Sequence, residues 1–445
     1  MSASRRRSCG RLGPVALRGG VLGLLYLVWL SASADSSSTG PEVSIAPPAS
    51  TSLEARPSSD ESPTETLGLQ TSPRELEAIG ELARSGIEPH RENVQQLLHI
   101  ADRGWPHGKV GTRFEAKSGA GGVYDKRCER LERPTDKALL PEAGRPLYAL
   151  VLAHLLTGRE SYAREAREVL LDFTRSSGFD TLEGAQSLSG ANQCALEVSL
   201  LTPLLIDSAL LLEAYPGWRE SDERALGAWL RTEIYPLTAA IARKRKNNWG
   251  TAAAFASWAI GHYLSGTEER LEERSPAPRR LSPEEAKASH LEAQLRILGN
   301  DWQGDGRCTK SGVRADGGFP EELRRGSTGC EGEHLRDTDG SYAYQITTLS
   351  HLIYHAEALR RHGGNELYTY TLENGKAMLP EAIGFVTANE SGRSFDWKAT
   401  EIGVLRVANA FYEDARLCEQ TAKGKRFAEG RYLPFARLTR PHGCE

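Results

Sequence analysis

A run of four cations, two amides, an aromatic ring and a glycine lies near the middle of the chain, in the order Arg243, Lys244, Arg245, Lys246, Asn247, Asn248, Trp249 and Gly250. The four positive charges would attract an anionic ligand. The two amides offer neutral, directional donors that could bind a single carboxylate. A solvated basic turn that caps a helix has the same composition, so the octapeptide alone leaves both interpretations open.

A second stretch, further along the chain, combines a glycine turn, cations and tyrosines. The turn at Gly317-Gly318 leads to Pro320, and proline is typical of the first residue of a helix. Arg336 precedes Tyr342 across an expected loop-to-helix junction, so the two side chains could touch. A nearby guanidinium lowers the pKa of a tyrosine, which suits a general base. On a helix, Tyr344 would point about 200° away from Tyr342, and the spacing from Arg336 favours Tyr342.

The N-terminal segment has the features of an export signal. Three arginines precede the apolar run from Val21 to Leu30, and the small residues Ala32-Ser33-Ala34 follow it. We therefore expect a signal peptide over residues 1–34 and a secreted or periplasmic protein. An uncleaved membrane anchor is the alternative, but the run is well short of the roughly 20 apolar residues that span a bilayer. After cleavage we expect no stable membrane insertion.

Charge argues against nucleic acid as a partner. The formal net charge is −4 for the whole chain, and removal of the five arginines in residues 1–34 makes it about −9. Binding to nucleic acid depends on phosphate neutralisation by many Lys and Arg side chains, which an acidic protein does not provide. The basic run at 243–246 is then a local exception.

Six cysteines remain after the signal segment is removed, and an even number in an exported chain allows three disulfides. Short loops suggest the pairs Cys308–Cys330 and Cys418–Cys444, which leaves Cys128–Cys194. Zinc is the alternative use of cysteine, but close Cys/His spacing is missing from the sequence. We expect neither a metal nor a cofactor.

The remaining sequence predicts a linker followed by one all-α domain. Residues 35–72 are rich in Ser, Thr, Pro and Glu, and such a composition does not support a packed core. Helical hairpins from residue 73 to 445 indicate an incomplete (α/α) toroid. We expect a Gly-rich loop at 104–126, a surface excursion at 267–283, and helices over 73–85, 92–103, 145–157, 161–176, 192–213, 222–241, 248–265, 283–298, 342–361, 380–387 and 398–411.

Four segments together resemble the alginate lyase-like polysaccharide lyases, a family with an (α/α) toroid fold. They are residues 148–173, the pair Asn247-Asn248 with its following helix, residues 316–326 (DGGFPEELRRG) and residues 336–359. The resemblance spans about residues 100–410 and implies that 73–445 is a catalytic domain. It also implies β-elimination at a uronic acid linkage of an acidic polysaccharide, of the alginate or glucuronan type. We expect the protein to be a monomer.

The resemblance implies roles for particular residues. Asn248, assisted by Asn247, would neutralise the substrate carboxylate, and Tyr342 would act as base and acid beside Arg336. Several relatives carry a histidine where this chain has Trp249, so the aromatic ring would stack on a sugar or simply pack. An assisting histidine would then come from elsewhere, in the order His334, His290, His262. Further substrate contacts are expected from Arg243, Arg245, Lys246, Trp249, Asn192, Gln193, Arg325 and Tyr344.

Two other functions remain open on the sequence. A glycoside hydrolase on the same fold would use two carboxylates, and the candidates are Glu321, Glu322, Asp337 and Asp339. A secreted glycan-binding protein without catalysis is the second alternative. His351 and His355 have the i,i+4 spacing of a metal pair, but without a third ligand we interpret them as one face of a packed helix.

Overall fold

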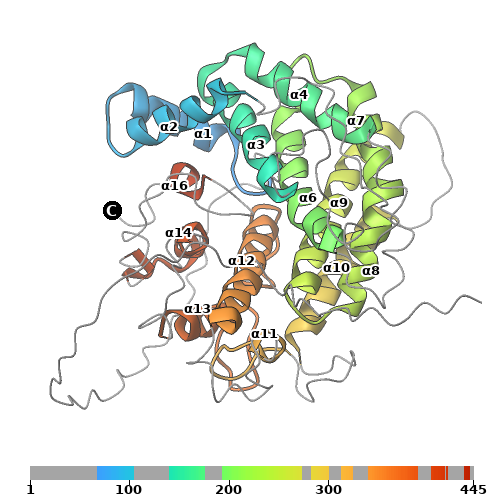
Figure 1. Cartoon of the computed structure of the whole chain (residues 1–445), viewed down its shortest axis with the longest axis vertical. Helices are drawn as coiled ribbons and strands as arrows, with labels where there is room; N and C mark the ends of the chain where they lie inside the picture. Colours follow the sequence, from blue (N-terminus) through green and yellow to red (C-terminus); the bar gives the residue numbers. More distant parts are fainter. Residues whose placement is uncertain are drawn as a thin grey trace, which may run out of the picture. The chain divides into compact units, whose positions relative to one another are not determined.

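Helix α9, Asn248–Glu272, packs against α6, α8, α10 and α12 in the computed structural model, so it is the central element of the fold (Figure 1). The structure describes residues 68–104, 140–175, 193–272, 282–299, 312–323, 339–388, 402–415, 417–418 and 435–440. All of them belong to one unit, Ser52–Glu445. In this part of the chain the one extended pairing is an isolated bridge between Thr371 and Ala377.

The remaining helices confirm the all-α prediction. Their bounds are α1 Pro73–Arg84, α2 His90–Asp102, α3 Leu140–Thr157, α4 Glu160–Arg175, α6 Gln193–Leu212, α7 Glu220–Trp229, the π-helical turn η3 Leu230–Ile234, α8 Tyr235–Lys244, α10 Pro283–Leu298, α11 Pro320–Leu323, α12 Asp339–Arg361, α13 Met378–Ala388, α14 Ile402–Tyr412 and α16 Ala436–Thr439. Among these helices, none is long and apolar enough to cross a membrane.

Consecutive helices form hairpins, and the hairpins pack in sequence order. The turn at Gly158 joins α3 to α4, with its glycine at φ 70°, a left-handed conformation that favours glycine. Contacts then lead from α3 to α6, from α6 to α9, from α9 to α12, from α12 to α14 and from α14 to α16. Helix α16 contacts α1, and α1 contacts α3 again. This closed series of contacts is the arrangement that an (α/α) toroid requires.

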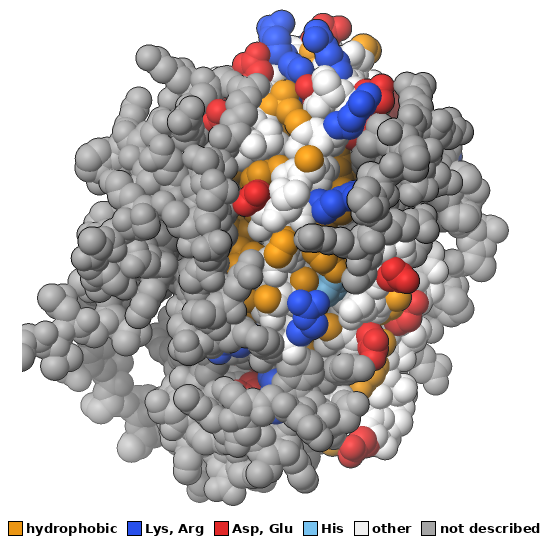
Figure 2. Space-filling model, turned by 90° about the vertical axis from the view of Figure 1, so that its right-hand side faces the viewer, with side chains coloured by type: hydrophobic (Ala, Val, Ile, Leu, Met, Phe, Trp, Pro, Cys, Tyr) orange, Lys and Arg blue, Asp and Glu red, His pale blue; other side chains and the backbone are white. Residues whose placement is uncertain are grey.

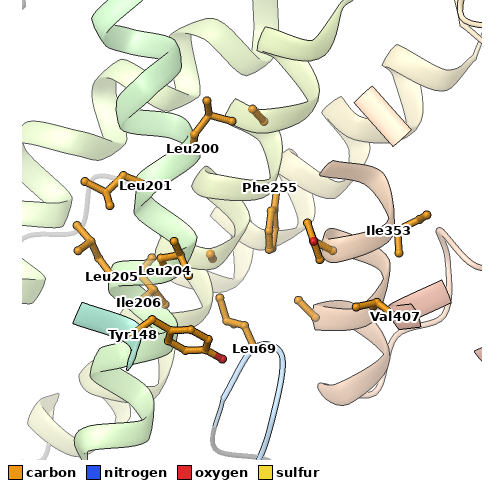
Figure 3. Close-up of a cluster of buried hydrophobic side chains, with 14 of the residues drawn as sticks. Leu69, Tyr148, Leu200, Leu201, Leu204, Leu205, Ile206, Phe255, Ile353 and Val407 are labelled. Carbon is orange, nitrogen blue, oxygen red and sulfur yellow. The ribbon is translucent and has the colours of Figure 1, made fainter. Parts of the chain in front are cut away.

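One apolar core connects the helices of this series. Figure 3 shows Tyr148 of α3, Leu204 of α6, Phe255 of α9, Ile353 of α12 and Val407 of α14 around the same space, and all five are buried. Burial of a large apolar side chain stabilises the folded state by about 1.5–3 kcal/mol. The core therefore holds together helices that are far apart in the sequence.

The folded part begins before residue 73, which corrects the expected linker boundary. Leu69 and Thr71 are fully buried. The Leu69 N–H donates to Asp207 Oδ1 at 2.6 Å, and Arg440 donates to the Gln70 carbonyl at 2.6 Å. Residues 68–72 therefore belong to the domain, whereas the signal peptide and the rest of the linker lie outside the described residues.

Two expected helices differ in their internal structure or length. The segment expected as one helix over 222–241 is divided by η3 and extends to Lys244. Pro236, at the start of α8, lacks an N–H, and a π turn accommodates the interrupted bonding. The helix expected to end at Gly266 continues to Glu272. A single glycine costs only about 1 kcal/mol in a helix, and the strong helix formers after it offset that cost.

A buried ion cluster joins the two ends of the domain. Glu357 in α12 accepts from Arg361 at 2.8 Å and from Arg440 at 2.7 Å. Arg361 also donates to Glu75 in α1 at 2.6 Å. Burial alone would raise the pKa of Glu357, but the guanidinium groups of Arg361 and Arg440 hold it far below its usual range. The cluster is satisfied as a unit, so removing one member would leave a buried charge uncompensated.

Stability should fall with acid through Glu75, whose pKa is lowered from 4.5 to about 2 against the effect of burial, by Arg440 and Arg361. Because the pKa of Glu75 is lower in the folded state, its carboxylate stabilises the fold at pH values above 4.5, the pKa in the unfolded chain. This contribution is lost as the pH falls from 4.5 to about 2. Because the side chain is 36% exposed, solvent screening reduces the expected contribution to the order of 1–2 kcal/mol.

Glu75→Gln should therefore flatten the pH dependence of the melting temperature in this window. Glu77→Gln on the exposed side of the same helix is the control and should keep the wild-type slope. A wild-type slope in Glu75→Gln would contradict the assignment.

Candidate functional site

The two adjacent asparagines occupy different positions at the start of α9. Asn247 is the capping residue, because its Oδ1 accepts the Trp249 N–H at 3.2 Å and its carbonyl accepts the Thr251 N–H at 3.1 Å. Asn248 is the first helical residue and is 4% exposed, whereas Asn247 is half-buried. A Cβ at Gly250 would lie 2.1 Å from the Arg245 carbonyl oxygen, so this tight link between α8 and α9 requires glycine.

Glu322 of α11 fixes the first turn of α9 from the outside. Its Oε1 accepts the backbone N–H of Asn248 and also the hydroxyl of Thr348 in α12, at 3.0 Å. Glu322 is buried. An anionic carboxylate at a helix N-terminus is stabilised by the helix dipole and by the unpaired N–H groups there. One carboxylate thus connects three helices.

Helix α12 also holds the glycine turn that precedes α11. The Gln345 side chain accepts the Phe319 N–H at 3.0 Å and donates to the Phe319 carbonyl at 2.8 Å. Gly317 has φ 87°, and a Cβ there would lie 2.2 Å from the Glu381 backbone. Both features of Gly317 explain why glycine is needed at this position of the turn.

The two tyrosines of α12 face different environments. Tyr342 is 1% exposed, while Tyr344 is half-buried. Tyr342 lies about one helical turn before Gln345 and so on the same side of α12 as the contact with the α11 segment. The difference in exposure agrees with the expectation that the two side chains point in different directions.

His351 is the histidine that reaches the asparagine pair. Its Nδ1 lies 3.4 Å from the Thr251 hydroxyl, which itself donates to the Asn248 carbonyl at 3.1 Å. Burial lowers the pKa of His351 to about 3, although a hydrogen bond to the Asn248 backbone raises it in part. The imidazole is therefore uncharged at neutral pH.

The side chains of the basic run differ in their exposure to solvent. Arg243 is exposed and Lys246 is half-buried, whereas the Arg245 guanidinium lies 5.3 Å from the ring centroid of Trp249. Trp249 is 8% exposed, so packing is favoured over the stacking on a sugar that we considered. Figure 2, which shows the side on which Figure 1 draws α8 and α10, has Lys and Arg side chains scattered among apolar and acidic ones.

The other described histidines pack inside the helical layers. His290 lies 2.9 Å from the Tyr235 hydroxyl, and burial lowers its pKa to about 4. The His262 ring lies between Trp258 and His362. His355 stacks on Phe255 at 5.1 Å. The contacts of His290 and His262 are thus with residues other than the asparagine pair. The interpretation of His351 and His355 as a packed face of α12 is confirmed by their burial.

Several predicted residues lie outside the described residues, so their roles stay predictions. These are Arg336, His334, Arg325, Asn192 and Asp337, together with the side chains of Lys244, Gln193 and Asp339. Among the cysteines, Cys418 is half-buried, and the Asn409 amide lies 3.0 Å from its sulfur. The side chains of the other five are not described, so the three pairings also stay predictions.

Sequence reasoning missed what Glu322, Thr348 and His351 do. Glu322 was considered only as a hydrolase carboxylate, and His351 only as a packed residue. One signal was available: the α12 sequence inserts Thr348 and His351 among apolar residues, and buried polar groups need partners. The partner of Thr348 lies 26 residues away and that of His351 lies 100 residues away, so the pattern alone does not identify them.

The capping geometry predicts opposite outcomes for two substitutions of Asn247. Asn247→Ser keeps an oxygen for the Trp249 N–H, so the free energy of unfolding should change by only about a few tenths of a kcal/mol. Asn247→Ala removes the cap and should cost about 1 kcal/mol. Denaturant unfolding of the full chain measures both, and equal stability of the two variants would contradict the capping role.

Comparison with known proteins bears on the family and the fold. A model of the alginate lyase family matches residues 120–271. A search of curated proteins gave no match. An alginate lyase from Bacteroides ovatus is 15% identical, with a TM-score of 0.50 over 84% of this chain and 97% of that chain. A Tyr-to-Phe variant of alginate lyase A1-III complexed with tetrasaccharide is 15% identical, with a TM-score of 0.53 over 85% and 96% of the two chains.

A His-to-Ala variant of the same enzyme, also complexed with tetrasaccharide, is 16% identical, with a TM-score of 0.51 over 85% and 96% of the two chains. At these identities the solved structures establish the fold, and the family model adds the relationship over residues 120–271. The expected resemblance is confirmed over residues 120–271, and the chain has the (α/α) toroid fold of the alginate lyase structures that it matches.

Proposed function

We propose that the chain is a secreted polysaccharide lyase that cleaves a uronic-acid-containing polysaccharide, of the alginate or glucuronan type, by β-elimination. The family match supports a lyase, and the tetrasaccharide complexes of alginate lyase A1-III support an acidic glycan as substrate. One observation carries the mechanism. Through Glu322, the asparagine pair at the start of α9 is connected to α12, the helix that carries Tyr342.

The amides would stabilise the negative charge that develops on the substrate during the reaction. Removing the C5 proton of a uronate adds negative charge beside a carboxylate that is already ionised. Hydrogen-bond donors aimed at that carboxylate stabilise the enolate-like transition state, typically by about 3–4 kcal/mol for one donor. Asn248 would supply such a donor. The Oδ1 of Asn247 is occupied by the Trp249 N–H, which leaves its NH₂ group to assist.

Tyr342 would move the proton. Its phenolate takes the proton from C5, the electron pair of that bond forms the C4–C5 double bond, and the C4–O bond breaks. The phenol then returns the proton to the leaving glycosidic oxygen, so no water is consumed. Arg336 would hold Tyr342 and favour its phenolate. His334 would assist from the same segment.

The cations would bind the polymer beside the cleaved linkage. Arg243 is exposed and Lys246 is half-buried, so both could pair with neighbouring uronates. Arg245 would contribute charge from its position over Trp249. Arg325, Asn192, Gln193 and Tyr344 would complete the binding surface.

The structure weakens the hydrolase alternative. A glycosidase needs two carboxylates that face the substrate. Glu322 is 1% exposed, and its Oε1 accepts from both the Asn248 backbone and Thr348. Glu321 beside it is 5% exposed. A carboxylate held by these contacts serves as a structural acceptor rather than as an acid or a nucleophile.

Activity tests the proposal through three variants and a substrate panel. Wild-type protein should release ultraviolet-absorbing unsaturated ends from alginate or glucuronan. Asn248→Ala should lower kcat/KM by about 10²–10³-fold, and Tyr342→Phe should lower it by at least about 10²-fold. Tyr344→Phe, the matched control on the same helix, should stay within a few-fold of wild type.

Full activity in Tyr342→Phe would exclude this tyrosine as the base. Tight polymer binding without cleavage, unchanged in Tyr342→Phe, would favour the glycan-binding alternative instead.

A further inference from the structure

Both backbone groups of Asn248 are held by contacts that lead to one face of α12. The N–H donates to Glu322, which accepts from Thr348. The carbonyl accepts from Thr251, whose hydroxyl lies 3.4 Å from His351 Nδ1. Thr348 and His351 are three residues apart, which places them on adjacent turns of the same helix face.

The Thr251 hydroxyl donates its proton to the Asn248 carbonyl, so its contact with His351 Nδ1 requires the imidazole to be the donor. The imidazole therefore donates through Nδ1 and stays neutral. At 2% exposure it is shielded from solvent. It is suited to hold the backbone, and it is unsuited to carry a positive charge to the substrate.

We propose that His351 is a positioning residue for the asparagine pair: it holds the Asn248 carbonyl through Thr251 and thereby sets the direction of the amides toward the substrate carboxylate. This inference rests on the proposed lyase function. The amides act only if their donors point at the developing charge, and a displacement of about 1 Å in such a group can cost about 10²-fold in rate.

The residue after the asparagine pair is a tryptophan, which packs and has no imidazole to offer. Trp249 packs beneath Arg245 and provides no hydrogen bond to the amides' backbone from its ring. Within the described part of the chain, an imidazole reaches the pair from α12, about 100 residues later. A neutral histidine from a neighbouring helix thus supplies orientation at the start of α9.

His355 provides a matched control on the same helix. It is fully buried, and burial also lowers its pKa to about 3. It stacks on Phe255 and Trp258, further along α9, at 5.1 and 5.3 Å. Within the described part of the chain, neither of its ring nitrogens has a hydrogen-bond partner. His355 therefore packs against α9 without holding its first turn.

The test compares His351→Leu, His351→Asn and His355→Leu in the full chain. His351→Leu should lower kcat about 10–100-fold with KM changed less than about threefold, since positioning acts on the transition state. His351→Asn places an N–H near the position of Nδ1 and should restore most of kcat. His355→Leu should keep kcat within about twofold of the wild-type value, even if it lowers the melting temperature as much as His351→Leu does.

Amide hydrogen exchange gives a readout independent of activity. His351→Leu should lose protection at residues 248–252, and His355→Leu should keep it. The proposal is overturned if His351→Leu retains wild-type kcat, if His355→Leu loses as much, or if protection at 248–252 does not change. A wild-type protein that cleaves no uronate polymer, while His351→Leu still loses protection, would refute the proposed function and leave the structural role of His351 intact.

Discussion

The position of the candidate site depends on one buried carboxylate. Glu322 accepts from the Asn248 backbone and from Thr348, and so it joins the start of α9 to α11 and α12. Burying a carboxylate is unfavourable unless its oxygens are hydrogen-bonded. The N-terminus of a long helix offsets this cost with a dipole and an N–H group that would otherwise lack an intrahelical partner. The same contact that stabilises the helix end therefore places the asparagine pair.

Most of the hydrogen-bonding and positioning roles that we propose at this site belong to uncharged groups. The amides of Asn247 and Asn248 donate without a dependence on pH, and buried His351 is uncharged. In a site of low dielectric, fixed dipoles stabilise developing charge without the reorganisation that water requires. The cations lie before the helix, where Arg243 is exposed. In the proposed mechanism, different residues thus attract the polymer and stabilise the transition state.

The sequence predicted the helices well because their signals are local. Ser282 with Glu285 forms a capping box, and α10 runs from Pro283 to Leu298 as expected. Local signals failed where tertiary contacts decide. Leu69 lies in a polar part of the sequence, yet it is buried in the core and its N–H donates to Asp207. The helix past Gly266 continues because one glycine is a weak stop signal.

The candidate site was predictable in residue type and less so in arrangement. The asparagine pair stood out because two amides follow four cations, and Tyr342 because of its spacing. The division of the pair into a cap and a first helical residue requires backbone geometry. Glu322 and His351 required contacts across about 75 to 100 residues, which no spacing rule provides.

The most direct test of the central claim is the mass balance of cleavage on a uronate oligosaccharide of defined length. Elimination consumes no water, so the summed masses of the two products should equal the mass of the substrate, and one product should carry the unsaturated end. Products whose summed mass exceeds that of the substrate by one water would show hydrolysis and would contradict the mechanism proposed for Asn248 and Tyr342.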